Sequence, residues 1–254
     1  MCAMMSLPRP RPIWRERFAG LAAASGLLLA CGASADVMLS ETVARLVSFG
    51  GACPHCNLAG RRLVGARFAG CAFVGASLAG ADLRGAVFAG ANLVGADLTG
   101  ADARGATMTA ANFMLARFGG AKLDGLEGAG GNFLKAEMAN AELRSAVLAG
   151  ATLTQVRGPA AVFEDANLVG ASLRGGHFED ASFRGANLNG ADLEGARFGR
   201  ADFAAASLVG SKLADADLSE SRHLSARQLR AACGDARTRL PAGLTVRPCR
   251  DVRR

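Results

Sequence analysis

The sequence predicts an all-β solenoid, and three observations lead to that fold class. Large apolar residues recur every five positions from Leu58 to Leu218, and Leu or Phe fills 28 of these 33 central positions. Alanine stands two residues before the centre in 25 units, and glycine two residues after it in 20. The register never slips, which indicates one continuous array of internal repeats rather than two domains.

The spacing of five excludes a long α-helix. At about 100° per residue, side chains five apart would spiral around a helix instead of forming one apolar stripe. Each periodic glycine would also cost about 1 kcal/mol relative to alanine inside a helix. Two positions of each unit, the centre and the residue two before it, lie on the same side of a short extended segment. The remaining residues can turn the chain, so we expect a coil with both positions inside.

Composition supports a folded chain. Half of the 254 residues are hydrophobic, which is too many for a disordered protein, and the 33 glycines do not recur every third residue as in collagen.

The first 35 residues predict a signal peptide. Four arginines precede an uncharged apolar run, Phe18 to Ala30, and Ala33-Ser34-Ala35 offers a cleavage site of small residues. The run is short for a membrane span. An alternative is a lipoprotein, because Leu28-Leu29-Ala30-Cys31-Gly32 resembles a lipobox that would place a lipid on Cys31. Both interpretations predict export, to the periplasm or the medium.

Three units show the repeat most clearly: Ala81–Gly85, Ala91–Gly95 and Ala186–Gly190. They resemble the A(D/N)LXX unit of the pentapeptide repeat family. The resemblance implies a right-handed, four-sided parallel β-helix with four units per coil, hence about eight coils over residues 57–218. At about 4.8 Å per coil the rod would be about 39 Å long.

Residues twenty apart should therefore stack on adjacent coils. One outward position alternates in charge over most of its length: Asp97, Arg117, Glu137, Arg157, His177, Arg197, Asp217. Opposite charges are favourable neighbours across strands. Inside, we expect two aromatic ladders, formed by Phe163, Phe183 and Phe203 and by Phe178 and Phe198.

Two units exchange large and small residues. Gly128 and Gly158 occupy centres, and Leu126 and Val156 take the position usually given to alanine. Because a close-packed core tolerates volume-conserving changes best, we expect these coils to be repacked in place.

The flanks of the array predict caps, which solenoids need to cover their ends. Residues 36–56 form the N-terminal cap, with a short helix expected from Ser40. Residues 219–254 form the C-terminal cap and a basic tail. There Ser225 and Gln228 have the spacing of a capping box, Leu224 and Leu229 that of a hydrophobic staple, and Gly234 would stop the helix.

Five cysteines remain after cleavage at Ala35. We predict two disulfides, Cys53–Cys56 and Cys233–Cys249, one in each cap. Cys71 takes a position usually given to alanine, so we predict a buried thiol there.

Cys53-Pro54-His55-Cys56 has the same letters as the active site of the thioredoxin-like disulfide oxidant of the bacterial periplasm. A thiol redox protein is therefore an alternative function, although that chemistry needs the motif at the start of a helix. No further metal ligands lie near His55, and we expect neither a metal nor another cofactor.

No catalytic arrangement stands out, so the sequence does not predict an enzyme. The family's best-known activity is DNA mimicry directed at gyrase, but residues 57–218 hold 16 acidic and 15 basic side chains, a net charge of −1. A mimic of a duplex should be strongly negative. The basic tail with Arg247, Arg250, Arg253 and Arg254 offers only non-specific attraction to nucleic acid.

We favour an exported, non-catalytic scaffold that presents a rigid face to an unidentified protein or envelope component. Membrane contact is expected only if Cys31 is lipidated.

Overall fold

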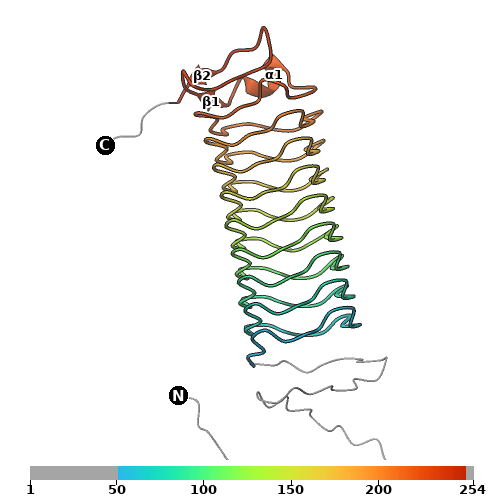
Figure 1. The fold of residues 1–254 in the computed structure, drawn as a ribbon. Coiled ribbons are helices and arrows are strands. Elements are labelled where there is room, and N and C mark those ends of the chain that lie inside the picture. The colour runs from blue at the N-terminus through green and yellow to red at the C-terminus, as the bar shows by residue number, and fades with distance from the viewer. Residues whose placement is uncertain (1–50, 250–254) are drawn as a thin grey trace, which may run out of the picture.

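The computed structural model describes residues 51–249, and these residues form one rod of stacked coils (Figure 1). The regular elements assigned outside the coils lie together at the C-terminal end. They are helix α1 (Ala226–Leu229) and the two short strands β1 (Cys233–Gly234) and β2 (Arg247–Pro248). The predicted signal peptide, the Cys31 site and the helix expected from Ser40 lie outside the described residues. Within residues 51–249 no helix is long and apolar enough to cross a membrane.

Four ladders of parallel bridges run along the rod, and as far as Arg222 each joins residues twenty positions apart. We name the four sides after these ladders: face A begins at Ala52, face B at Asn57, face C at Arg62 and face D at Arg67. Twenty residues in four units therefore make one coil, as the resemblance to the pentapeptide repeat family implied.

Each unit consists of one bridge residue and one turn. In the unit centred on Leu83, the Leu83 N–H donates to Asp102 O on the next coil at 2.7 Å, and Ala86 N–H closes the turn on Leu83 O at 2.9 Å. The third turn residue, Gly85, has a φ of 64°. A positive φ at this place is typical of a type II turn and favours glycine, which explains why glycine recurs there.

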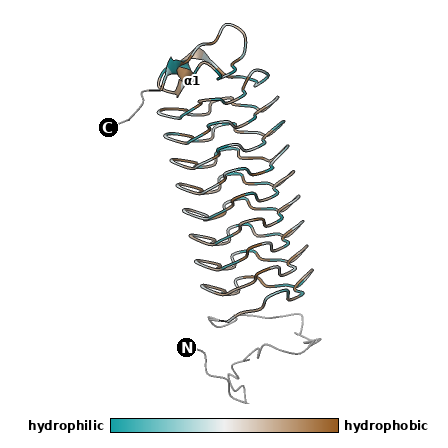
Figure 2. Ribbon diagram, turned by 60° about the vertical axis from the view of Figure 1, so that its left-hand side comes forward, coloured by the Kyte–Doolittle hydropathy of each residue, from teal (hydrophilic) through white to brown (hydrophobic). Residues whose placement is uncertain are grey.

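The centre and the alanine position both face inward, as expected. Leu83 and Ala81 are each 0% exposed, while Asp82 between them reaches the surface. Figure 2 shows the result as apolar and polar segments alternating along each coil.

The predicted aromatic ladders form in the core. The rings of Phe163 and Phe183 are stacked with centroids 5.0 Å apart, and those of Phe183 and Phe203 are stacked at 5.3 Å. Phe178 and Phe198 stack at 5.8 Å. Such contacts add to the stabilisation by burial.

The coils with exchanged residues keep their register. The bridges Thr107↔Glu127 and Glu127↔Val147 are regular on either side of Gly128. A Cβ atom added to Gly128 would lie 3.4 Å from Leu126 Cδ2, so Leu126 fills the space that a central side chain would occupy. At Gly158 the Phe178 ring fills the corresponding space, because a Cβ atom added to Gly158 would lie 3.3 Å from Phe178 Cδ1. Neither coil is bulged.

The array begins earlier than residue 57. Ala52 already bridges Ala72, and Cys53 takes the position of a central residue. The predicted N-terminal cap, 36–56, therefore includes six residues that belong to the first coil, because Gly51-Ala52-Cys53 keeps the small–outward–inward pattern.

The C-terminal cap contains the predicted capping box. The Ser225 side chain accepts from Gln228 N–H, and the Gln228 side chain accepts from Ser225 N–H at 2.9 Å. Beyond α1 the coil is completed over insertions: Lys212 bridges Cys233, and Asp217 bridges Arg239. Strand β2 then pairs with β1 in parallel and covers it.

Gly234 does not stop the helix. The C-cap of α1 is Arg230, and Gly234 lies in β1. A Cβ there would lie 2.6 Å from Thr238 Oγ1 and 2.7 Å from Val246 Cγ1. The glycine is needed for close packing of the cap rather than for a helix end.

Candidate functional site

The charged side chains of the rod gather on faces B and C. On face B the predicted alternation is realised, since Arg117 lies 3.6 Å from Asp97 and 4.0 Å from Glu137 on the neighbouring coils. At the corner between faces C and D, Arg144 is within 4.0 Å of Asp124, Glu142 and Glu164. Exposed pairs of this kind contribute little individually, about 0–1 kcal/mol each. They leave these two faces nearly neutral.

Faces A and D carry few charges. The bridge ladder of face D has two charged residues, Arg67 and Glu127. On face A the bridge ladder is uncharged from Ala52 to Ser172, and the first charge in that ladder is Asp192. The rod therefore has a charged half and a largely uncharged half, a division that the repeat pattern alone does not reveal. Sorting outward residues by coil position would have revealed it.

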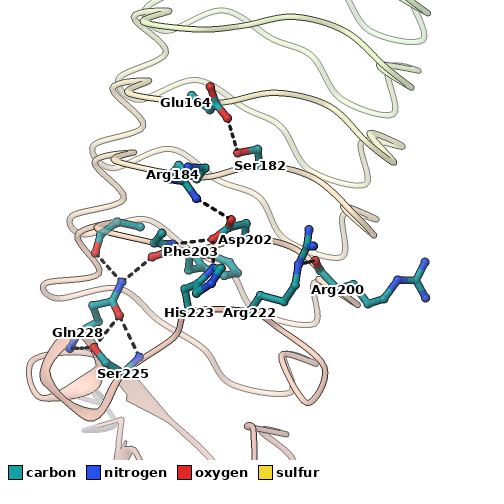
Figure 3. A network of polar contacts seen from close by, with 12 residues as sticks. Glu164, Ser182, Arg184, Arg200, Asp202, Phe203, Arg222, His223, Ser225 and Gln228 are labelled. Carbon is teal, nitrogen blue, oxygen red and sulfur yellow. Dashed lines mark hydrogen bonds and ion pairs between the residues drawn. The ribbon is translucent and has the colours of Figure 1, made fainter.

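A polar network joins the last regular coil to the C-terminal cap (Figure 3). The Asp202 carboxylate accepts from Arg184 at 3.1 Å, from His223 Nδ1 at 2.8 Å and from the N–H of Ala204 at 2.9 Å. The Gln228 amide donates to Phe203 O at 2.7 Å and to Ala206 O at 3.0 Å. These contacts fix α1 against the open end of the core.

The environment of Asp202 favours its ionised form. Burial raises the pKa of this carboxyl, but the hydrogen bonds from Ala204, His223 and Arg184 outweigh that effect, so the pKa lies below the ordinary aspartate value. Asp202 is only 8% exposed, which is unusual for an acidic residue. Nothing in the sequence around Asp202 marks it, because the residue stands in an ordinary repeat.

A hollow of about 610 Å³ lies beside this network, between Ala204–Val209 and the residues His223, Ser225, Arg227 and Gln228. Its Gln228 amide and Ser225 hydroxyl are already used in capping α1 and binding the last coil. A small-molecule site normally offers several convergent polar groups to its ligand. The geometry is better suited to docking the cap than to binding a ligand.

The predicted cysteine pairs are brought together at opposite ends of the rod. The Cα atoms of Cys53 and Cys56 are 5.4 Å apart, and those of Cys233 and Cys249 are 4.7 Å apart, both within the usual range for disulfides. Cys71 is 1% exposed in the core. Cys53 and Cys56 stand at the first corner of face A. In the C-terminal cap, Cys233 belongs to β1 and Cys249 directly follows β2.

The surroundings of Cys53 and Cys56 differ from those of a redox motif. Cys53-Pro54-His55-Cys56 forms a corner of the first coil, with Cys56 N–H donating to Cys53 O at 3.4 Å, and no helix begins there. A helix N-terminus would be needed to stabilise a thiolate in the thioredoxin manner.

The three histidines of the chain lie far apart: His55 in the first coil, His177 on face B and His223 in the cap. Within residues 51–249 no group of three His, Cys, Asp or Glu side chains could hold a metal ion.

Comparison with known proteins agrees with the repeat. The family model described as "Pentapeptide repeats" matches residues 55–90, 91–125 and 161–200, with eight copies. No curated protein is significantly similar to the chain.

Several solved structures are similar in part. HetL from Nostoc sp. strain PCC 7120, a pentapeptide repeat protein involved in heterocyst differentiation regulation, is 25% identical. That match covers 67% of this chain and 86% of HetL, with a TM-score of 0.37.

QnrB1, a plasmid-mediated fluoroquinolone resistance protein, is 24% identical in one trypsin-treated form, over 66% of this chain and 87% of QnrB1, with a TM-score of 0.45. A pentapeptide repeat protein of the Arabidopsis thaliana thylakoid lumen is 26% identical over 59% of this chain and 82% of its own, with a TM-score of 0.21. The repeat unit, its twenty-residue coil and the family match agree, and the chain belongs to the pentapeptide repeat family.

Proposed function

We propose that this protein is an exported, non-catalytic scaffold whose rigid surface binds a protein or envelope component. In this proposal the mature chain is a right-handed, four-sided β-helix of about eight coils, closed at both ends by caps. The observation that carries the proposal is the unbroken array of outward side chains, which four bridge ladders hold at regular coil spacing from Ala52 to Arg222. Such a surface suits an extended partner, as in other solenoids.

Export is supported by two independent features. The first 35 residues have the basic start, apolar run and small-residue site of a signal peptide. The cysteine pairs at the two ends of the rod have disulfide geometry, and disulfides persist in oxidising compartments. We therefore place the protein in the periplasm or outside the cell, with anchoring through Cys31 as the lipoprotein alternative.

A DNA-mimic function is disfavoured by charge. Duplex DNA carries one negative charge per about 1.7 Å, so a rod of about 39 Å would need about 23 uncompensated charges to imitate it. Residues 57–218 have a net charge of only −1. QnrB1 is a fluoroquinolone resistance protein, but its structural similarity to this chain is too low to transfer that role.

The redox alternative is also disfavoured. Cys53 and Cys56 face inward at a solenoid corner, partly buried against the core. An insulin-reduction assay would support this alternative if the protein catalysed reduction and a Cys56→Ser variant did not.

Photo-crosslinking in intact cells tests the proposed function. A photoreactive residue would replace one outward residue on each face: Asn112 on A, Arg117 on B, Lys122 on C and Val147 on D. The proposal predicts adducts with an envelope or secreted protein from one or two neighbouring faces. Equal labelling from all faces, or an adduct with gyrase, would contradict it.

A further inference from the structure

The C-terminal end of the rod concentrates positive charge. Residues 219–249 contain six arginines against only Glu220 and Asp235, a net charge of +4. Residues 71–218, which we call the shaft, contain 16 acidic and 12 basic side chains, a net charge of −4. The end of the rod and the shaft therefore have opposite signs. A surface of one sign attracts partners of the other sign and repels partners of its own.

Four of the six cap arginines are not neutralised by a carboxylate. Arg237 and Arg239 form ion pairs with aspartates at 3.4–3.6 Å. The other four are exposed and form no ion pair with any acidic side chain of residues 51–249: Arg222, Arg227, Arg230 and Arg247. Their charge is available to a partner.

Three of these arginines gather around the end of α1. Arg227 stands in its last turn, and Arg230 is its C-cap. Arg247 Nε donates to Ala232 O at 3.1 Å, and Arg247 Nη2 donates to Ala231 O at 3.2 Å. The two carbonyl oxygens fix the Arg247 guanidinium beside α1 without cancelling its charge.

An uncharged loop crosses the end of the rod next to these arginines. The loop, residues 240–246, connects Arg239 on face B with Arg247 on face A. Its larger apolar side chains pack against the core, and Ala242 and Gly243 between them are exposed. Figure 1 shows the chain after α1 passing over the C-terminal end of the rod. This end therefore combines exposed arginines with an uncharged, largely apolar loop.

We propose that the C-terminal end of the rod binds an anionic phospholipid surface. The arginines bind the lipid phosphates, and residues 240–246 lie at the headgroup boundary. The same surface repels the shaft, so the rod stands on its C-terminal end instead of lying flat. This contact differs from the sequence-based expectation, in which only a lipid on Cys31 would bring the protein to a membrane.

The side chains at this end favour lipid over nucleic acid. Every phenylalanine of residues 51–249 is buried, and the whole chain has no tyrosine. Proteins that bind single strands stack the bases on exposed aromatic side chains, which this surface lacks. A duplex would attract the arginines but gain nothing from the loop, whereas at a lipid surface apolar side chains enter the boundary of the acyl chains.

Co-sedimentation with vesicles tests the proposal on the protein purified from its native compartment. We expect binding to phosphatidylcholine vesicles that contain about 30% phosphatidylglycerol, and loss of that binding between about 0.1 and 0.5 M NaCl. Pure phosphatidylcholine vesicles should bind much less. A lipid on Cys31 would add binding to both kinds of vesicle and would not reproduce the difference between them. In the cell the contact rests on the proposed export, but vesicle binding does not, so the two can fail separately.

A double variant and its matched control locate the contact. Arg227→Gln/Arg230→Gln should bind the anionic vesicles about tenfold more weakly. Its melting temperature should not change, because neither side chain forms a hydrogen bond or ion pair within residues 51–249. Arg61→Gln/Arg62→Gln removes the same charge from two exposed arginines at the opposite end and should change binding by less than about twofold.

A second pair of variants tests the loop. Ala242→Asp places a carboxylate on its exposed part and should weaken binding about fivefold. Ala160→Asp makes the same change on the shaft, at an exposed turn position whose left-handed backbone aspartate tolerates, and should leave binding unchanged. Equal binding to neutral and anionic vesicles, equal losses in the two arginine variants, or tighter binding to duplex DNA than to anionic vesicles at the same salt would overturn the proposal.

Discussion

The carboxylate of Asp202 and the imidazole of His223 form a hydrogen bond of 2.8 Å that joins the last regular coil to the C-terminal cap. Asp202 lies on face C, and His223 lies in the C-terminal cap, two residues before Ser225, the N-cap of α1. With Arg184 at 3.1 Å on the other side, the carboxylate ties two coils and the cap together. This contact makes cap docking sensitive to acid.

The Asp202→Asn variant should therefore lose stability at neutral pH by about 1–3 kcal/mol. The pKa of Asp202 is lowered in the folded protein, so its stabilisation is present above the unfolded value near 3.9 and is lost as pH falls through the folded value. Urea unfolding followed by circular dichroism should separate wild type and variant at pH 7 and bring them together in strong acid. A stability difference that persists unchanged below pH 3 would contradict this role of Asp202.

The inward and outward positions predict opposite results for neighbouring residues. Leu168 is 0% exposed and Val169 is 39% exposed. Leu168→Asp should destabilise the rod by about 4 kcal/mol or more, because it buries an unpaired charge. Val169→Arg should change the stability by less than about 0.5 kcal/mol. Equal melting temperatures of the two variants would refute the assignment of the two positions.

The exchange at Leu126 and Gly128 predicts strong coupling. Leu126→Ala alone should cost about 2–5 kcal/mol by leaving a cavity. Gly128→Leu alone should overpack the core, since a Cβ there would already lie 3.0 Å from Leu148 Cδ2. The double variant restores the common repeat, so much of the loss should be recovered, and a double-mutant cycle in urea measures this. Simple additivity would show that Leu126 does not fill the space at Gly128.

The Cys233–Cys249 pair is predicted to stabilise the C-terminal cap. A bond across sixteen positions contributes about 3 kcal/mol in the chain-entropy description. A Cys233→Ser/Cys249→Ser variant should release the cap while the coils before Leu208 persist. Proteolysis should then begin within residues 224–249. Peptide mapping without reduction is the direct check, and a disulfide that includes Cys71 would contradict the pairing.

The coil could be predicted from the sequence because every unit repeats the same local chemistry. Glycine recurs at the turn position, where the structure has a positive φ, and alanine and leucine recur at the two inward positions. These recurrences reveal the period and the inward face from the sequence. The spacing of Ser225 and Gln228 likewise predicted the N-terminal cap of α1. The prediction that Gly234 stops the helix was wrong. The residue must be glycine because the side chains of Thr238 and Val246 leave no room for a Cβ atom, and these contacts arise only when the cap folds. Asp202 escaped notice for a similar reason. Its importance depends on Arg184 and His223, which the coil brings beside it, and its own unit does not contain that information.

An intact-mass measurement of the protein extracted from the periplasm or the medium tests whether it is an exported and oxidised scaffold. We expect a chain that begins after Ala35 and therefore lacks Trp14, the only tryptophan. Its mass should be four hydrogen atoms below that of the reduced chain, as two disulfides require. A lipid on an N-terminal Cys31 would select the lipoprotein form. A fully reduced chain that retains Trp14 and is recovered only from the cytoplasm would rule out export.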